Sequence, residues 1–459
     1  MQSAATDALT EAQNFTSLQD AQWLNAHWMP FTGNRNFKAR PRIITAAKGA
    51  YFTDADGRQI FDGLSGLWCS GLGHGRQEIA QAIGQAALQL DYAPAFQFGH
   101  PASFELANRI VGLMPKGLDR KLEHVFFTGS GSESADTSLK MARAYWRAKG
   151  QGSKTRLIGR EKGYHGVNFG GISVGGMVGN RKTFGQGIEA DHLPHTQPPM
   201  GSFCKGMPQT DGKALADRLL DLIALHDASN IAAVIVEPMS GSGGVVIPPA
   251  GYLQRLREIC TQNNILLIFD EVITGFGRLG AMTAAEAFGV TPDIMNIAKQ
   301  VTNGAQPLGA CVVTPEIYNC FMDAGGPEYM LEFAHGYTYS AHPVACAAGI
   351  AALDLLEKED GPGRVRELAP FFAQAVHSLQ GARHVLDIRN IGLAAGLTIE
   401  PAPGEPAKRP YEIAMKCWDA GFYVRYGGDT IQLAPPFISE KAEIERLINA
   451  LGDALQATE

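Results

Sequence analysis

One acid and one amine each stand at the end of an apolar stretch in the middle of the chain. Asp270 follows the run Ile265 to Phe269, and Lys299 follows the largely apolar segment 294–298. Burying either charged group is costly without a use for it, and a desolvated lysine can form Schiff bases. Pyridoxal phosphate (PLP) uses such a pair, the amine for its aldehyde and the acid for its pyridine nitrogen. The spacing favours this function over the plainer alternatives of a helix-capping Asp270 and a snorkelling Lys299.

A turn rich in glycine and serine follows the predicted strand His124–Thr128. Residues 129–134 (GSGSES) would present free backbone N–H groups at a helix start, where a phosphate could bind. Ser130 and Glu133 also fit a capping box, which would make the turn a simple helix start, and both interpretations stay open. The turn has neither the dinucleotide fingerprint G-x-G-x-x-G nor the Gly-Lys-Ser/Thr of a Walker A loop.

Three further residue groups could carry chemistry. Tyr164, in a Gly-Tyr-His-Gly loop after the next strand, could stack on a flat ring, although an ordinary partly buried tyrosine is the simpler interpretation. Glu237 ends another apolar run in the same way. His192 and His195 have a spacing that resembles metal ligands, but no cysteine or carboxylate cluster completes the set, so we expect no metal site.

Short apolar runs that alternate with helical patterns must position these residues. The predicted strands are His124–Thr128, Thr155–Arg160, Ala232–Glu237, Ile265–Asp270, Ile294–Ala298 and Ala310–Thr314. Such runs, separated by helices, predict an α/β domain with a mostly parallel sheet covered on both faces. Ligands of such sheets bind beyond the carboxyl ends of the strands, where Asp270 and Lys299 are expected.

The chain is too long for a single hydrophobic core, and its ends differ from its middle. Residues 1–65 and 346–459 are expected to form one smaller domain, which packs against a large domain made by residues 66–345. Its last element is an amphipathic helix over Glu440–Ala457, and residues 194–212 are expected to form a surface loop.

Composition excludes several classes of protein. The net charge of −7 argues against nucleic acid or an anionic membrane as the main partner. Seven scattered cysteines with no C-x-x-C pair indicate a reducing compartment. Residues 1–34 contain no Lys or Arg and no long apolar run, so no secretory signal is expected there. No apolar stretch is long enough to cross a membrane. We expect a cytoplasmic protein.

Several segments resemble class III PLP aminotransferases. Those typical of the class are FDEVITGFGR (269–278), NIAKQVTNGAQPLGA (296–310) and HGYTYSAHPVACAAG (335–349). Others resemble the omega-amino acid–pyruvate (beta-alanine–pyruvate) branch: HWMPFTGNRNFKARPRI (27–43), LSGLWCSGLGHGRQEI (64–79), FTGSGSESADTSLKMARAYW (127–146), KGYHGVNFGGISVGG (162–176) and YVRYGGDTIQLAPPF (423–437). The resemblance runs from about Trp23 to the end of the chain.

The resemblance implies the type I fold of PLP-dependent transferases, with a seven-stranded large domain and a small α+β domain. It implies that Lys299 would hold PLP covalently and that Asp270 would pair with the pyridine nitrogen. Val272 would pack on one face of the ring, and Tyr164 on the other, close to the substrate, with His165 nearby.

The resemblance also implies the remaining contacts to the cofactor. Ser130, Gly131 and Ser132 would hold its phosphate at a helix start, joined by the partner subunit's Thr338 in a homodimer, or a dimer of dimers, with active sites at the interface. Glu237 would lie near the cofactor.

A second set of residues would contact the substrate. Trp68 would line the pocket, with Phe31 and Phe96 as apolar walls. Arg425 would bind a substrate carboxylate through two hydrogen bonds, and Gln432 would lie behind it.

The implied activity is a ping-pong transfer of an amino group from a beta-alanine-like omega-amino acid or a simple amine to pyruvate. An aminomutase or decarboxylase of the same fold remains an alternative, since both would also need the lysine and the acid. A non-enzymatic regulator would require a DNA-binding segment, and the sequence contains no basic arm for one.

Overall fold

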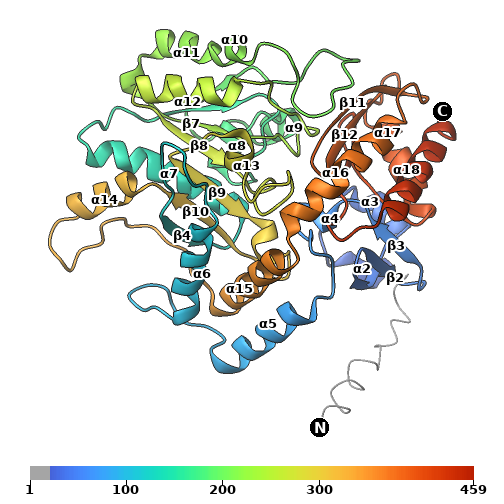
Figure 1. Ribbon diagram of the computed structural model, residues 1–459, viewed down its shortest axis with the longest axis horizontal. Helices are drawn as coiled ribbons and strands as arrows, with labels where there is room; N and C mark the ends of the chain where they lie inside the picture. Colours follow the sequence, from blue (N-terminus) through green and yellow to red (C-terminus); the bar gives the residue numbers. More distant parts are fainter. Residues whose placement is uncertain (1–20) are drawn as a thin grey trace.

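The computed structural model describes residues 21–459 (Figure 1). Positions 1–20, which carry most of the stretch predicted to lack a secretory signal, lie outside the described residues. The central sheet has seven strands in the order β4-β10-β9-β8-β7-β5-β6. Their bounds are β4 His124–Thr128, β5 Arg156–Arg160, β6 Ala190–Leu193, β7 Ile231–Val236, β8 Leu266–Asp270, β9 Ile294–Ala298 and β10 Gly309–Val313.

The predicted mostly parallel sheet is confirmed. Strands β6, β5, β7, β8 and β9 run parallel to one another, and only β10 is antiparallel to its neighbours β9 and β4. The six predicted strands are all present, with ends that differ by at most one residue. The short strand β6 was not predicted, because its sequence ADHL carries two polar residues.

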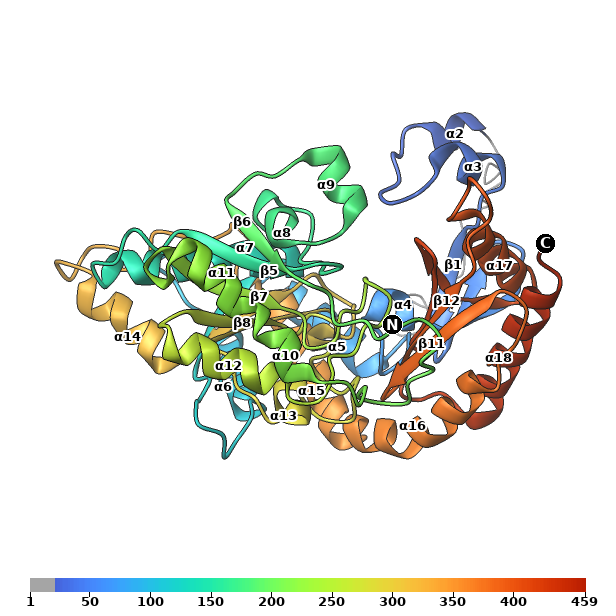
Figure 2. The same cartoon turned by 90° about the horizontal axis from the view of Figure 1, so that it is seen from above.

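Side chains alternate between the two faces of the central sheet, as the period of a strand requires. Val234 and Val236 of β7 pack on one face with helices α6, α12 and α15, whereas Ala233 and Ile235 pack on the other with α7 and α14. These helices are α6 Pro101–Gly112, α7 Gly131–Ala148, α12 Tyr252–Gln262, α14 Pro315–Ala324 and α15 Pro343–Lys358. Figure 2 shows α7 on one side of the sheet and α6 and α12 on the other. Both faces of the sheet are therefore covered.

Two smaller sheets lie beside this layer structure. The first combines β1 Ile44–Lys48, β2 Tyr51–Asp54 and β3 Gln59–Asp62 with β13 Phe422–Tyr423 from the far end of the chain. The second is antiparallel, in the order β11-β12-β15-β14, with bounds β11 Val385–Ile391, β12 Ala394–Ile399, β14 Arg425–Gly427 and β15 Thr430–Leu433. The N-terminal and C-terminal segments thus share a sheet.

Helices complete the fold. Near the C-terminus they are α16 Gly361–His377, α17 Lys408–Asp419 and α18 Lys441–Gln456, the last being the predicted amphipathic helix. The others are α2 Ala21–Asn25, α3 Asn34–Ala39, α4 Ser65–Trp68, α5 Gln77–Gln89, α8 Phe169–Val174, α9 Val178–Phe184, α10 Gly212–Ala216, α11 Arg218–His226 and α13 Ala284–Phe288, with 3-10 turns η1 Ala228–Asn230 and η2 Lys299–Thr302.

Two further observations bear on the composition-based expectations. Over residues 21–459, no helix combines the length and the apolar character that a membrane crossing requires. All seven cysteines lie within the described residues, and each of them is a free thiol.

Candidate active site

Asp270 and Lys299 lie at the same edge of the central sheet. Asp270 is the last residue of β8, and Lys299 directly follows β9, which pairs with β8 in parallel so that Asp270 lies opposite Asn296. Parallel neighbours end at one edge, so the predicted acid and amine come together at the carboxyl ends of the strands. Lys299 has a positive φ of 53° and starts the tight turn η2, so the strand ends at the residue before it, Ala298.

Burial lowers the pKa of the Lys299 amine. The nearby charges of Asp270, Cys69 and Glu237 oppose this shift, and Arg425 adds to it. The side chain stays partly accessible to solvent although protein atoms crowd it on most sides. An amine in this state gives up its proton more easily than an ordinary lysine, which is what a nucleophile or a general base requires.

His165 orients the carboxylate of Asp270. Its Nδ1 lies 2.8 Å from Asp270 Oδ2, and the backbone N–H of Val272 donates to Oδ1 over 3.2 Å. Because an ionised carboxylate only accepts hydrogen bonds, Nδ1 carries the proton. The other ring nitrogen, Nε2, is buried and has no hydrogen-bond partner among the described residues. Asp270 is therefore held by two donors while retaining lone pairs for a third.

Glu237 ties together two loops beside Asp270. Its Oε1 accepts from the backbone N–H of Tyr164 over 2.9 Å, and its Oε2 accepts from that of Gly241 over 3.1 Å. Burial raises the pKa of this carboxyl group, His165 lowers it and Asp270 raises it further. The acid that ends the apolar run 232–237 thus fixes the Tyr164 loop.

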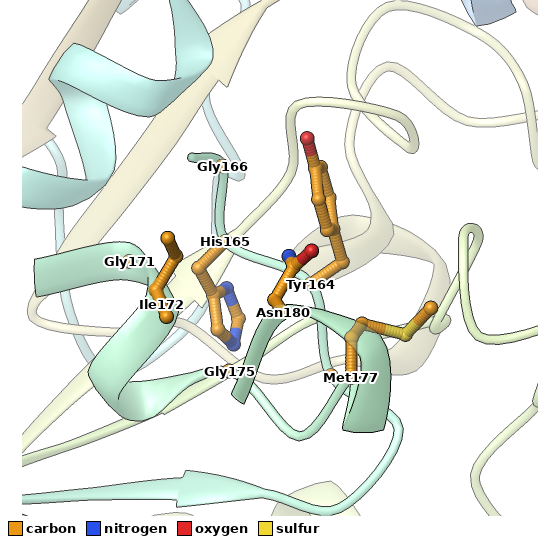
Figure 3. Close-up of a pocket in the computed structure, with 9 residues that line it drawn as sticks. Tyr164, His165, Gly166, Gly171, Ile172, Gly175, Met177 and Asn180 are labelled. Carbon is orange, nitrogen blue, oxygen red and sulfur yellow. The ribbon is translucent and has the colours of Figure 1, made fainter. Parts of the chain in front are cut away.

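The Tyr164 loop presents its two rings in different directions (Figure 3). Tyr164 and His165 project away from each other, and a small hollow beside them is lined also by Met177 and Asn180. Burial raises the pKa of the Tyr164 phenol, so the ring carries a neutral hydroxyl.

The glycine-serine turn starts helix α7, as its capping pattern predicts. Ser130 accepts from the backbone N–H of Glu133 over 3.2 Å, and the Glu133 carboxylate accepts from that of Gly129 over 2.6 Å. A Cβ at Gly131 would lie 2.9 Å from Val272 Cγ1, so this turn directly abuts the segment after Asp270.

Ser132 connects the same turn to the Tyr164 loop. Its Oγ accepts from the backbone N–H of Val167 over 3.2 Å, and a Cβ at Gly166 would lie 2.4 Å from that oxygen. The turn, the Tyr164 loop and Asp270 therefore form one continuous surface at the carboxyl edge of the sheet.

Arg425 and Gln432 lie opposite each other on strands β14 and β15. Arg425 is close enough to Lys299, Tyr164 and Tyr423 to affect the pKa of each of them. Gln432 is buried, and its Nε2 donates to the carbonyl of Ser242 over 3.2 Å. The second small sheet thus carries Arg425, the residue predicted to bind a carboxylate, to the vicinity of Lys299 and Tyr164.

The three aromatic residues predicted to surround the substrate differ in their exposure. Trp68 is 2% exposed and packs in a buried cluster with Met239, Val245 and Ile273. Phe31 and Phe96 are 75% and 53% exposed. Within one chain, these two rings therefore face solvent.

Thr338 lies on the same exposed face as Phe96. A Cβ at Gly336 would touch the Phe96 ring at 2.6 Å, and the Tyr92 hydroxyl donates to the Thr338 carbonyl over 3.1 Å. Among the described residues, no hydrogen bond joins Thr338 to the turn at Gly131 and Ser132.

Two residues near the site were missed at the sequence level. Arg160 is 1% exposed and donates to the Glu237 carbonyl over 2.6 Å and to Ser240 Oγ over 2.7 Å. A charged residue at the end of the apolar strand 155–160 is the same signal that singled out Asp270, so it could have been found. Cys69, close to Lys299, carries no such signal.

The two histidines with metal-like spacing, His192 and His195, lie apart from this arrangement in the sequence. Over residues 21–459, no group of three or more His, Cys, Asp and Glu side chains could hold a metal ion. His192 lies in β6, where its Nε2 hydrogen-bonds with the Gly175 carbonyl over 2.9 Å.

Comparisons with known proteins agree on one family. The family model of class-III aminotransferases matches residues 32–455. The chain is 62% identical to a beta-alanine–pyruvate aminotransferase of Pseudomonas aeruginosa, covering 94% of this chain and 96% of that protein. It is 58% identical to an omega-amino acid–pyruvate aminotransferase of Pseudomonas putida, covering 96% and 97%.

A solved structure shares the fold. The PLP-bound amine transaminase from an uncultivated Pseudomonas species superposes with a TM-score of 0.87 at 36% identity, covering 94% of this chain and 99% of that one.

Proposed function

This chain belongs to the class-III aminotransferases, and we propose that it transfers the amino group of a beta-alanine-like omega-amino acid, or of a simple amine, to pyruvate. The products are alanine and an aldehyde or ketone. The fold is the type I fold of PLP-dependent transferases. One observation carries the proposal: the Lys299 amine, with its pKa lowered by burial, stands beside Asp270 at the carboxyl edge of the sheet.

The cofactor of this family is PLP, and the residues at the site fit it. The chain offers an amine for its aldehyde, an acid for its ring nitrogen and a helix start for its phosphate. Gly131 has no side chain at the point where a Cβ would crowd Val272, so the helix start that would hold the phosphate can pack directly against the segment after Asp270. When bound, PLP supplies a conjugated ring that accepts the electrons released when a proton leaves the substrate carbon.

We assign the proton transfers to Lys299. Its unprotonated amine removes the proton from the carbon that bears the amino group and returns it at a neighbouring atom, so one base serves both half-reactions. Asp270 would pair with the ring nitrogen of the bound cofactor, and His165 Nδ1 holds that carboxyl group in place at 2.8 Å. Tyr164, whose backbone is tethered by Glu237, would stack on the ring of the bound cofactor.

We assign the recognition of the substrate carboxylate to Arg425, since a guanidinium can form two parallel hydrogen bonds with it. Gln432 lies beside it on β15. Trp68 shapes the pocket from the buried cluster behind it, and Phe31 and Phe96 are apolar walls.

We further propose a homodimer. Phe31, Phe96 and Thr338 are exposed in a single chain, and exposed large apolar side chains such as the two phenylalanines are typical of an interface between subunits. A second copy that covers the face around Phe96 would bring the partner subunit's Thr338 to the phosphate turn at Gly131.

The function is tested by measuring alanine formation from pyruvate with a panel of amine donors. We expect activity with beta-alanine and with an arylalkylamine, and none in Lys299→Ala, because no other base replaces the amine. Arg425→Ala is expected to lose at least about tenfold more activity with beta-alanine than with the arylalkylamine, as removal of a charge-assisted contact implies.

Steady turnover of Lys299→Ala would contradict the assignment of the base, and equal losses in Arg425→Ala would contradict the carboxylate role. The alternative of an aminomutase or decarboxylase is not favoured by the relatives. Release of carbon dioxide, or isomerisation of the amine without pyruvate, would restore it.

The free state of all seven cysteines supports a reducing compartment, and we propose a cytoplasmic location. Fractionation of the native host's cells would test it.

A further inference from the structure

A short hairpin lies between the cofactor side of the site and the second small sheet. Residues 240–246 turn back on themselves, with reciprocal backbone hydrogen bonds of 2.9 Å between Ser240 and Val246. Its base is held from the large sheet, since Glu237 accepts from Gly241 and Arg160 donates to Ser240. The tip therefore projects from a fixed base towards the sheet of strands β11, β12, β14 and β15.

Four residues on that small sheet form one row facing the tip. Arg389 on β11 lies opposite Gly396 on β12, Gly396 lies opposite Gln432 on β15, and Gln432 lies opposite Arg425 on β14. Directly opposed residues of antiparallel strands present their side chains on the same face. With strands about 4.8 Å apart, the row extends about 14 Å from Arg389 to Arg425.

Two residues of the row, Arg389 and Gln432, donate hydrogen bonds to the backbone of the hairpin, and Gly396 between them packs against it. Arg389, which is 1% exposed, donates from Nε to the Gly244 carbonyl over 2.7 Å. Gln432 donates to the Ser242 carbonyl over 3.2 Å. Gly396 lets the hairpin approach, because a Cβ there would lie 2.3 Å from the Gly244 oxygen.

The hairpin is shaped for this approach. Gly244 has a φ of +107°, and a Cβ at that position would lie 2.7 Å from Arg389 Nη2 and 3.1 Å from Thr430 Oγ1. Val245 also has a positive φ, of 58°. Arg389 is itself fixed by Thr398 Oγ1 at 2.8 Å and by Asp387 at 3.5 Å. Gly244, Gly396 and the buried Arg389 together allow the hairpin to pack closely on the second small sheet.

We propose that Arg389 and Gly396 are positioning residues for substrate recognition. By holding the hairpin 240–246 on the row, they set the position of Gln432 and Arg425 relative to Lys299. They are thereby specificity determinants for donors and acceptors that carry a carboxylate. The inference rests on the carboxylate-binding role of Arg425 in the proposed function.

The test compares Arg389→Met, Arg389→Lys and Gly396→Ala with Arg425→Ala. In the two variants that remove the contact, we expect the KM for beta-alanine and for pyruvate to rise roughly tenfold, the effect of losing one hydrogen bond from a charged donor. The KM for an arylalkylamine and the kcat with that amine should change much less. Arg389→Lys keeps a charged donor and is expected to lie in between.

A second measurement does not depend on turnover. Hydrogen exchange of the peptide covering residues 240–246, in the cofactor-free chain, should become faster in Arg389→Met and Gly396→Ala. Gly427→Ala is the matched glycine control, because a Cβ at that position of the same sheet meets nothing within 4 Å. Arg257→Met is the matched arginine control. This buried arginine pairs with Asp293, which lies just before β9 at the amino-terminal edge of the central sheet.

The outcomes distinguish the positioning role of Arg389 and Gly396 from the carboxylate-binding role of Arg425. Unchanged exchange in the hairpin, or equal losses for both kinds of amine in Arg389→Met and Gly396→Ala while Arg425→Ala is selective, would overturn this proposal alone. Equal losses in Arg425→Ala would overturn the carboxylate role on which it rests. Because Arg389→Met leaves Asp387 buried without its cation and could fail to fold, Gly396→Ala and Arg389→Lys keep the proposal open to refutation.

Discussion

Two opposing influences act on the Lys299 amine. Burial lowers its pKa, and the charge of Asp270 raises it by less, so the amine loses its proton below the ordinary lysine value of 10.5. Because the charge of Asp270 offsets part of this shift, the amine can act as an acid as well as a base, as the proton transfers proposed for Lys299 require.

The balance can be tested through Asp270→Asn, which removes the charge that raises the pKa of Lys299 while keeping the shape of the side chain. We expect reductive methylation of Lys299 in the cofactor-free chain, followed by mass spectrometry, to extend to lower pH than in the wild type. Exposed Lys358 in the same digest serves as the internal reference for the reagent. An unchanged profile would mean that Asp270 does not act on this amine.

The same shift predicts how stability depends on pH. Since the folded cofactor-free chain holds the Lys299 proton less tightly than the unfolded chain, its stability should rise with pH up to about the unfolded value. Urea unfolding of wild type and Lys299→Met, compared across this range, isolates the contribution. The wild type should have the steeper rise, and parallel curves would contradict the lowered pKa.

At the scale of single elements, the start of helix α7 links three parts of the site. Its turn touches Val272 through Gly131 and the Tyr164 loop through Ser132. The helix itself packs on the face of the sheet opposite α6 and α12. A strand, a loop and a helix start thus meet where the phosphate is expected.

Gly131→Ala tests this meeting point. The new Cβ would lie 2.9 Å from Val272, so the turn must shift, and we expect PLP to bind roughly tenfold more weakly by fluorescence titration. Gly84→Ala in helix α5 is the control, because that glycine is exposed with nothing within 4 Å. It should leave PLP binding unchanged and raise stability by up to about 1 kcal/mol. Equal PLP affinity in both variants would contradict the phosphate site.

At the scale of the whole molecule, the question is whether two chains share each site. Lys299 stands at the carboxyl edge of the sheet, whereas Thr338 and Phe96 lie together on an exposed face. If each site takes Thr338 from the other subunit, two different defects placed on separate chains leave one site intact.

Mixing Lys299→Ala with Thr338→Ala chains, after dissociation and reassembly, is therefore expected to restore activity towards that of one intact site per dimer. Each variant alone serves as the control, and size-exclusion chromatography reports the assembly. Failure of the mixture to exceed the Thr338→Ala chain alone would show that the threonine acts within its own subunit.

Much of the architecture was predictable because it depends on local patterns. Six apolar runs predicted six strands of the central sheet, and the acid and amine at the ends of two runs indicated their chemistry. The strand Ala190–Leu193 was not predicted, because its two adjacent polar residues, Asp191 and His192, do not stand out from a loop. That Trp68 packs in a buried cluster with Met239, Val245 and Ile273 follows only from the fold, since these residues are far apart in the sequence.

The sequence by itself determined which ionisable side chains stand at the ends of the strands, because residue types and their positions at strand ends are local properties. The tertiary structure alone decided how those groups are aligned. Arg389, Gly396, Gln432 and Arg425 form one row only through the register of four antiparallel strands, and a one-residue slip would turn side chains to the other face. Likewise, the contact of Gly131 with Val272 joins positions more than a hundred residues apart, and only packing brings them together.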